Sequence, residues 1–160
     1  MSAGVPPVAR SRRGFTIVEL LVVMIVMGIL ASIAVLKWVD LKDQARTAKI
    51  NSEFAAVRIA DMSYWAENSK HAPEVGPGVI PPELASLLPG GFTFDHTAEG
   101  YVLDWDNLGS GGGGYQVGVT VTATNSHLEG ALERIFGHQY PFFRAGNALT
   151  YILVGPDGLM

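Results

Sequence analysis

A single carboxylate borders the long apolar stretch near the start of the chain. Residues 20–36 contain no charged side chain, and Glu19 directly precedes them. As a helix, the segment from Phe15 to Leu36 would span roughly 33 Å, close to the bilayer core of about 30 Å. A carboxylate in that environment costs at least ~2.5 kcal/mol. Glu19 is therefore a candidate functional residue, and the chemistry it offers is pairing with a cation.

The residues around Glu19 resemble the signal segment of the type IV pilin-like family, which includes type IV pilins and type II secretion pseudopilins. The resemblance rests on a basic leader, two aliphatic residues before a long apolar helix, and four positions: Gly14, Phe15, Thr16 and Glu19. It is specific from Arg12 to about Ala34. It implies that a prepilin peptidase cleaves after Gly14 and methylates the new terminal amine of Phe15.

The same resemblance implies a function and a set of partners. Glu19 would pair with the amine of Phe15 on a neighbouring subunit during assembly in the membrane, and this pairing offsets the cost of burying both charges. The chain would be a structural subunit of a type IV pilus or a type II secretion pseudopilus. Its partners would be the prepilin peptidase, other pilin or pseudopilin subunits, an inner-membrane assembly platform and membrane lipid.

Two other interpretations of the N-terminal segment compete with this one. Ser32-Ile33-Ala34 could be the cleavage site of an ordinary secretory signal, but the uncharged run of 17 residues from Leu20 exceeds the roughly 7–15 residues of such a signal. A plain membrane anchor with an accidental Glu19 would leave the Gly-Phe-Thr segment unexplained. The pilin-like interpretation accounts for all of these features together.

The basic residues predict how the chain crosses the membrane. Arg10, Arg12 and Arg13 precede the apolar stretch, so the positive-inside rule places the N-terminus in the cytoplasm and the chain after Lys37 outside. The predicted segments are a leader at 1–14, a transmembrane helix at 15–38 in a single-pass inner-membrane protein, and an extracytoplasmic domain at 39–160. The chain has no cysteine, unlike many pilins, which close a C-terminal loop with a disulfide.

The charge of the exported part excludes one class of partner. After Lys70 the chain has two basic side chains and nine acidic ones, a net charge of −7. Proteins that bind nucleic acid neutralise phosphates with Lys and Arg. The sequence therefore predicts no nucleic-acid partner.

The apolar helix is predicted to continue to about Ser69, because no proline or glycine occurs between Ala31 and Lys70. Many relatives have a proline soon after the apolar stretch, and its absence here removes an expected helix bend.

Two stripes of residues run along the part of this helix after the apolar stretch. The first, here called the heptad stripe, has apolar or small residues and consists of Trp38, Leu41, Ala45, Ala48, Ser52, Ala55, Ile59, Met62 and Ala66. A second, the bulky stripe, consists of Ile50, Phe54, Val57 and Trp65. We expect the bulky stripe to face the domain core and the heptad stripe to be shared with other subunits.

The rest of the chain predicts a small antiparallel sheet. Strands are expected at 101–105, 115–124 and 149–154, with a short helix at 82–88 and a second helix that Asn125 or Ser126 caps and Gly137 ends. The predicted fold class is α+β, with the long N-terminal helix packed on this sheet.

Outside the membrane, the residues that resemble a ligand site are Asp104, Asp106 and Asn107. Alternate oxygen ligands before a glycine-rich turn can bind calcium, but Tyr115 stands where an EF-hand loop has its final glutamate. The four histidines, His71, His96, His127 and His138, lack the spacing of a metal site. No enzyme and no cofactor is predicted: the turn at Asp104, Asp106 and Asn107 is expected to be solvated, and calcium binding is the alternative. Besides the structural subunit, the open alternatives are a minor subunit that binds a ligand or mediates adhesion, and a membrane-tethered enzyme, for which no catalytic residues are evident.

Overall fold

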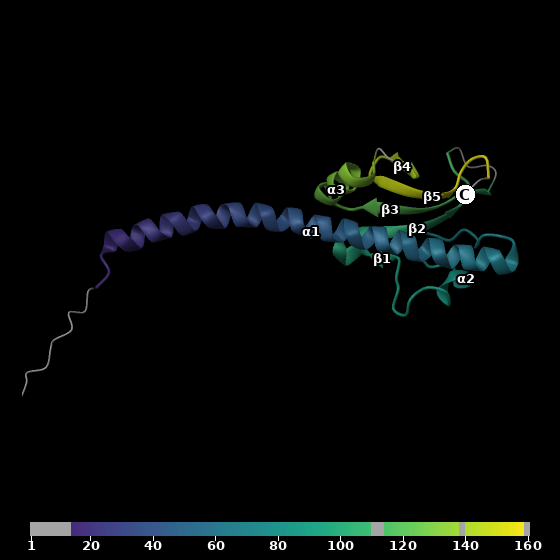
Figure 1. Cartoon of the computed structure of the whole chain (residues 1–160), viewed down its shortest axis with the longest axis horizontal. Helices are drawn as coiled ribbons and strands as arrows, with labels where there is room; N and C mark the ends of the chain where they lie inside the picture. The colour runs from purple at the N-terminus through teal and green to yellow at the C-terminus, as the bar shows by residue number, and fades with distance from the viewer. Residues whose placement is uncertain (1–13, 110–113, 138–139, 159–160) are drawn as a thin grey trace, which may run out of the picture. The chain divides into compact units, whose positions relative to one another are not determined.

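The computed structural model describes residues 14–109, 114–137 and 140–158, and has the predicted α+β architecture (Figure 1). The helices are α1 (Ile17–Asn68), α2 (Pro82–Ala85), η1 (Thr97–Glu99, a 3-10 helix) and α3 (Ser126–Phe136). The strands are β1 (Asp95–His96), β2 (Tyr101–Asn107), β3 (Val117–Ala123), β4 (Phe142–Ala145) and β5 (Ala148–Val154). The chain divides into one unit that ends at Val39 and a second, Asp40–Met160, and we describe each separately.

The described part of the first unit is helical from Ile17 onward. Every side chain from Ile17 to Val39 is exposed, including apolar ones on all sides of the helix. Among the described residues, α1 is the helix that is long and apolar enough to cross a membrane. An apolar surface of this kind is stable only in lipid or against other protein. The predicted limits of the leader, the transmembrane helix and the domain stay predictions.

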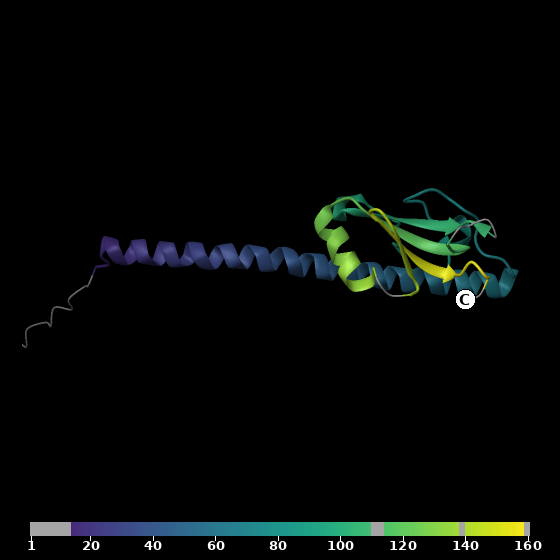
Figure 2. The same ribbon diagram turned by 90° about the horizontal axis from the view of Figure 1, so that it is seen from above.

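In the second unit, the C-terminal half of α1 packs on one face of a five-stranded antiparallel sheet (Figure 2). The strand order is β1-β2-β3-β5-β4, so β5 lies between β3 and β4. Alternate residues of β2 and β3 point toward the helix and are buried: Tyr101, Leu103, Trp105, Val117, Val119 and Val121. Each strand thus has the period of two that a half-buried sheet requires.

The face of α1 that meets the sheet is more polar than predicted. Ile50, Phe54 and Val57 are buried as expected, and the Phe54 ring stacks on Tyr151 at 5.5 Å. Trp65 was predicted to be buried with them, but it is 43% exposed, so this prediction is wrong. Four polar or charged side chains that the sequence analysis did not assign are buried instead: Asp43, Thr47, Glu53 and Asp61.

The heptad stripe lies on the opposite side of α1. All of its nine residues are exposed, with Ile59 at 65% and Met62 at 45%. The stripe is therefore not part of the described core, and its expected role in subunit contacts stays a prediction.

Element limits differ modestly from the predictions. The short helix α2 ends at Ala85 and not at Leu88, although Leu88 is buried in the core. Two strands were missed: β1 has only two residues, and β4 is a four-residue edge strand. Strands of this length carry too few alternating residues to produce a pattern in the sequence. Both are defined by pairing with β2 and β5.

Candidate functional site

Glu19 belongs to a capping box at the start of α1. The backbone N–H and the hydroxyl of Thr16 donate to Oε2 of Glu19 at 3.0 Å and 3.1 Å, and the N–H of Glu19 donates to the Thr16 hydroxyl at 3.2 Å. A threonine followed three residues later by a glutamate is the sequence signature of this motif. The sequence analysis missed it, because it treated Glu19 only as a group that pairs between subunits.

The capping box fixes where the carboxylate of Glu19 lies. It holds Oε2 at the N-terminal end of the helix, where unpaired backbone N–H groups carry partial positive charge. A carboxylate can accept about four hydrogen bonds, so Glu19 keeps capacity for a further donor. Gly14 and Phe15 lie just before the helix and are exposed, with Phe15 at 77%. Cleavage between them would leave every bond of the capping box intact.

A second candidate site is a carboxylate cluster formed by Glu74, Asp104 and Asp106. Asp104 and Asp106 point away from the buried side of β2, and Glu74 comes from the segment after α1. One oxygen of each residue lies within 4.8 Å of the others. Asn107, the third predicted ligand, holds this arrangement in place: its N–H donates to Glu74, and its side-chain amide donates to the carbonyl of Ala72 at 2.7 Å.

The electrostatics of the carboxylate cluster are unfavourable at neutral pH. Burial, followed by the nearby charges of Asp106 and Glu74, raises the pKa of Asp104 to about 6. Burial also raises the pKa of Glu74. The Tyr115 hydroxyl donates to Asp106 at 2.9 Å, whereas Oδ1 of Asp104 is buried without a hydrogen bond to the described residues. Three such oxygens suit calcium, although calcium takes about six to eight ligands. The prediction of a solvated turn, with calcium binding as its alternative, stays a prediction.

A buried polar network joins α1 to the β1 edge of the sheet. The carboxylate of Glu53 accepts from the hydroxyl of Tyr101 at 3.0 Å and lies 3.1 Å from Nε2 of His96. Lys49 donates to Glu99 of η1 at 2.6 Å. Burial raises the pKa of Glu53. These contacts join residues of α1 to residues of β1, η1 and β2, so the network links the helix to this edge of the sheet.

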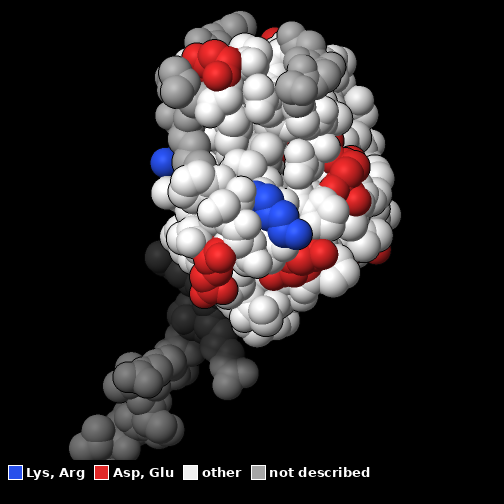
Figure 3. All heavy atoms as spheres, turned by 90° about the vertical axis from the view of Figure 1, so that its right-hand side faces the viewer, with Lys and Arg blue, Asp and Glu red and all other residues white. Residues whose placement is uncertain are grey.

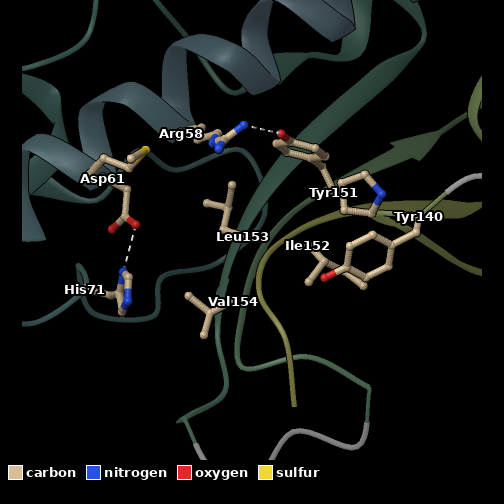
Figure 4. A pocket seen from close by; sticks show the side chains of 10 residues that line it. Arg58, Asp61, His71, Tyr140, Tyr151, Ile152, Leu153 and Val154 are labelled. Carbon is tan, nitrogen blue, oxygen red and sulfur yellow. Dashed lines mark hydrogen bonds and ion pairs between the residues drawn. The ribbon is translucent and has the colours of Figure 1, made fainter. Parts of the chain in front are cut away.

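A small cavity of about 260 Å³ lies between α1 and β5 (Figure 4). In its wall the carboxylate of Asp61 bonds Nδ1 of His71 at 2.8 Å, and Arg58 donates to the hydroxyl of Tyr151 at 3.1 Å. Burial raises the pKa of Asp61. None of the described residues that line this cavity is a serine, threonine or cysteine. The Asp–His pair therefore has no hydroxyl or thiol nucleophile of these types beside it.

The remaining histidines differ in environment. His96 is buried in the Glu53 network, His127 is exposed on α3, and His138 lies outside the described residues. Figure 3 shows acidic side chains distributed around one end of the domain, with few basic ones among them. Such a surface offers little to a phosphate backbone.

The comparisons with known proteins match the N-terminal segment. The family model for the prokaryotic N-terminal methylation motif matches residues 9–35. Over 48 residues the chain is 50% identical to the type IV narrow pilus major component PilA5 of Thermus thermophilus, which covers 30% of this chain and 41% of that protein. These matches confirm the predicted resemblance.

Type II secretion proteins are also similar to this chain. The chain is 40% identical over 62 residues to the type II secretion system core protein G of Klebsiella michiganensis, covering 39% of this chain and 44% of that protein. It is 32% identical over 91 residues to core protein G of Escherichia coli (strain K12), covering 57% of this chain and 61% of that protein. The matched regions thus span about half the length of these relatives. No solved structure matches the chain significantly.

Proposed function

We propose, on the premise that the chain carries the prokaryotic N-terminal methylation motif of type IV pilin-like proteins, that it is a structural subunit of a type IV pilus or a type II secretion pseudopilus. Relatives from both systems are similar to this chain, so the proposal covers both. In this role the subunit is processed by a prepilin peptidase and polymerises from the inner membrane.

The exposed apolar surface of the first unit supports polymerisation. A subunit in the membrane buries this surface in lipid, and a subunit in a fibre must bury it against other subunits. The exposed heptad stripe continues an apolar or small face beyond the membrane-length segment. A monomer that used α1 only as an anchor would have no need for this continuation.

The observation that carries the proposal is the position of Glu19 relative to Phe15. The capping box holds the Glu19 carboxylate at the end of α1, directly beside the residue whose amine cleavage would release. Pairing between this carboxylate and the Phe15 amine of the next subunit would neutralise two charges that are costly in lipid. We propose that the N-terminus lies in the cytoplasm and the second unit outside, with the assembly platform as a further partner.

Intact mass of the membrane-extracted chain tests the proposal. The expected species begins at Phe15 and carries one methyl group on its amine. A chain that begins after Ala34 would identify an ordinary secretory signal and overturn the proposal. A chain that keeps residues 1–14 in cells with an active prepilin peptidase would also overturn it. Gly14→Ala is the matched variant: it keeps a small residue at the cleavage site, so we expect partial processing.

A further inference from the structure

An arginine without an acid partner lies at the cavity of about 260 Å³ between α1 and β5 (Figure 4). Nη1 of Arg58 donates to the hydroxyl of Tyr151 at 3.1 Å, and no carboxylate of the described residues pairs with this guanidinium. By contrast, Arg46, Lys49 and Arg144 of the same unit each pair with a carboxylate. A guanidinium has five N–H donors, so most of the hydrogen-bonding capacity of Arg58 is open to a ligand.

Tyr151 fixes the direction of this guanidinium. Its ring packs against Phe54 of α1 and Phe142 of β4, with ring centroids 5.5 Å and 5.2 Å away. Because two neighbours hold the ring, its hydroxyl has a fixed position and orients Arg58 before any ligand arrives. A group that is oriented in advance loses less conformational entropy on binding, which favours affinity.

The cavity beside Arg58 has an apolar wall. This wall is formed by Met62 of α1 and by Ile152, Leu153 and Val154 of β5. An apolar cavity of about 150 Å³ holds a benzene molecule, so this cavity has room for an aromatic ring with a short substituent. Small-molecule sites combine such walls with a few polar groups that fix the orientation of the ligand.

Tyr140 adds an exposed aromatic ring to the same cavity. The residue is 81% exposed, and its ring stacks on no aromatic side chain of the described residues. Figure 4 shows Tyr140 and Tyr151 on one side of the cavity, and Asp61 and His71 on the other. An aromatic ligand on the β5 wall would therefore lie beside a ring that has a free face.

The charges around the cavity favour an anionic ligand. Asp61 is the acidic residue of the described lining, and its carboxylate is already bonded to Nδ1 of His71 at 2.8 Å. In Figure 4 the guanidinium of Arg58 extends toward Tyr151 and away from Asp61. An anion bound to Arg58 would thus lie apart from the buried carboxylate, whereas a cation would be repelled by the guanidinium.

We propose that this cavity binds a small carboxylic acid with an aromatic body. The ligand's carboxylate accepts hydrogen bonds from Arg58, whose planar guanidinium matches the two oxygens of a carboxylate. The ligand's ring lies on the wall of Ile152, Leu153 and Val154, beside Tyr140. This site is additional to the proposed fibre function and does not depend on it.

Phenylacetate is the probe that tests the proposal. It is titrated into the full chain in detergent and followed by saturation-transfer nuclear magnetic resonance, with protein-free micelles as the blank. We expect a dissociation constant of about 1 mM or below, which is ordinary for a ligand of about ten non-hydrogen atoms. A signal no larger than that of the blank would overturn the proposal.

A matched pair of arginine variants locates the binding. Arg58→Gln should weaken phenylacetate binding at least about tenfold, because it removes the charged donors to the carboxylate. Arg134→Gln removes the same charge from an exposed position of α3 outside the cavity, so it should leave binding unchanged. Equal affinities of these two variants would contradict the proposed site.

Two related compounds separate the charge of the ligand from its ring. Phenylacetamide keeps the shape but has no charge, so it should bind at least about tenfold more weakly, and Arg58→Gln should not weaken it further. A loss of phenylacetamide binding in this variant would indicate a damaged cavity and overturn the role of the guanidinium. Acetate has no ring and should also bind at least about tenfold more weakly than phenylacetate. Acetate binding as tight as that of phenylacetate would mean an adventitious ion only.

Tyr140→Ala provides a variant at a position too exposed to affect folding. The loss of ring stacking should weaken phenylacetate binding about fivefold and leave acetate binding unchanged. Unchanged phenylacetate binding would refute the contact with Tyr140. None of these measurements requires fibres, so their failure would leave the proposed function standing.

Discussion

The carboxylate of Glu19 accepts two hydrogen bonds from Thr16, one from its backbone N–H at 3.0 Å and one from its hydroxyl at 3.1 Å. Only the second depends on the threonine side chain. The chain therefore positions Glu19 through its own contacts, and in the proposed fibre Thr16 would act through Glu19 as a positioning residue.

Thr16→Ala should weaken assembly without preventing it. The variant loses the hydroxyl but keeps the N–H, so Glu19 retains one of its two hydrogen bonds, and the lost cap costs about 1 kcal/mol. We expect fibre yield to fall about fivefold by the relation between free energy and equilibrium constants. Thr16→Ser keeps a hydroxyl and should assemble nearly as the unaltered chain does. Equal yields from the Ala and Ser variants, measured against membrane-bound subunit, would show that the hydroxyl has no positioning role.

Glu19→Ala should abolish assembly while membrane insertion stays as good or improves. The substitution removes a charge that is costly in lipid, but it leaves the Phe15 amine of the neighbouring subunit unpaired on docking. Glu19→Gln keeps the shape and some hydrogen bonding, so we expect a partial defect. The measurement is sheared fibre relative to total membrane-bound subunit. Normal fibre yield from Glu19→Ala would refute the assembly role.

The raised pKa of Asp104 predicts an unusual pH dependence of stability. In the folded chain this carboxyl has a pKa of about 6, above its ordinary value of 3.8, so folding favours its protonated form. The ionised form of Asp104 therefore destabilises the folded state above pH 6. This destabilisation is lost as the pH falls toward 4. Asp104→Asn should raise stability at pH 7.5 by roughly 1 kcal/mol, because partial exposure screens much of the shift.

Thermal unfolding followed by circular dichroism at pH 5 and pH 7.5, with a chelator present, measures this effect. Asp95→Asn is a control in which we expect stability to change in the opposite direction. Hydrogen bonds from Thr97 lower the pKa of Asp95 and stabilise its ionised form. This variant should lower the midpoint at pH 7.5. An Asp104→Asn variant that is less stable than the unaltered chain at pH 7.5 would contradict the inferred repulsion.

Calcium should raise the unfolding midpoint if the carboxylate cluster binds it. The ion would neutralise Glu74, Asp104 and Asp106, and a dissociation constant of about 1 mM would stabilise the fold by roughly 1 kcal/mol at 5 mM calcium. Asp106→Asn should remove the effect, whereas Glu67→Gln, at an exposed position on α1, should preserve it. A midpoint that neither calcium nor a chelator changes would show that the cluster does not bind calcium.

The second unit should fold without the apolar segment. Residues 39–160 keep the buried part of α1, including Ile50, Phe54 and Val57, and carry a net charge of −7, which favours solubility. A cooperative thermal transition and a monomeric elution volume would support this boundary. Aggregation of the fragment under conditions that keep the full chain dispersed in detergent would contradict it.

Features that depend on local pattern could be predicted from the sequence alone. The apolar run at 20–36, the segment from Gly14 to Glu19, the alternation in β2 and β3 and the short apolar run of β5 each involve residues close together in the chain. Their composition, periodicity or spacing is therefore visible without a fold. The candidate functional residues Gly14, Phe15 and Glu19 were named from this segment and its resemblance to the type IV pilin-like signal, and their roles stay predictions. Even the capping box was visible as Thr16 and Glu19 three residues apart.

Contacts between groups far apart in the chain could not be predicted, because they depend on the fold. Glu74 lies beside Asp104 and Asp106 because the segment after α1 passes next to β2. Glu53 of α1 is buried against His96 of β1 and Tyr101 of β2. Trp65 is exposed because it lies near the end of α1, where it stacks beside His71 and not on the sheet. Burial and pairing of this kind depend on the path of the backbone between residues about 30 to 50 positions apart. No local pattern records that path.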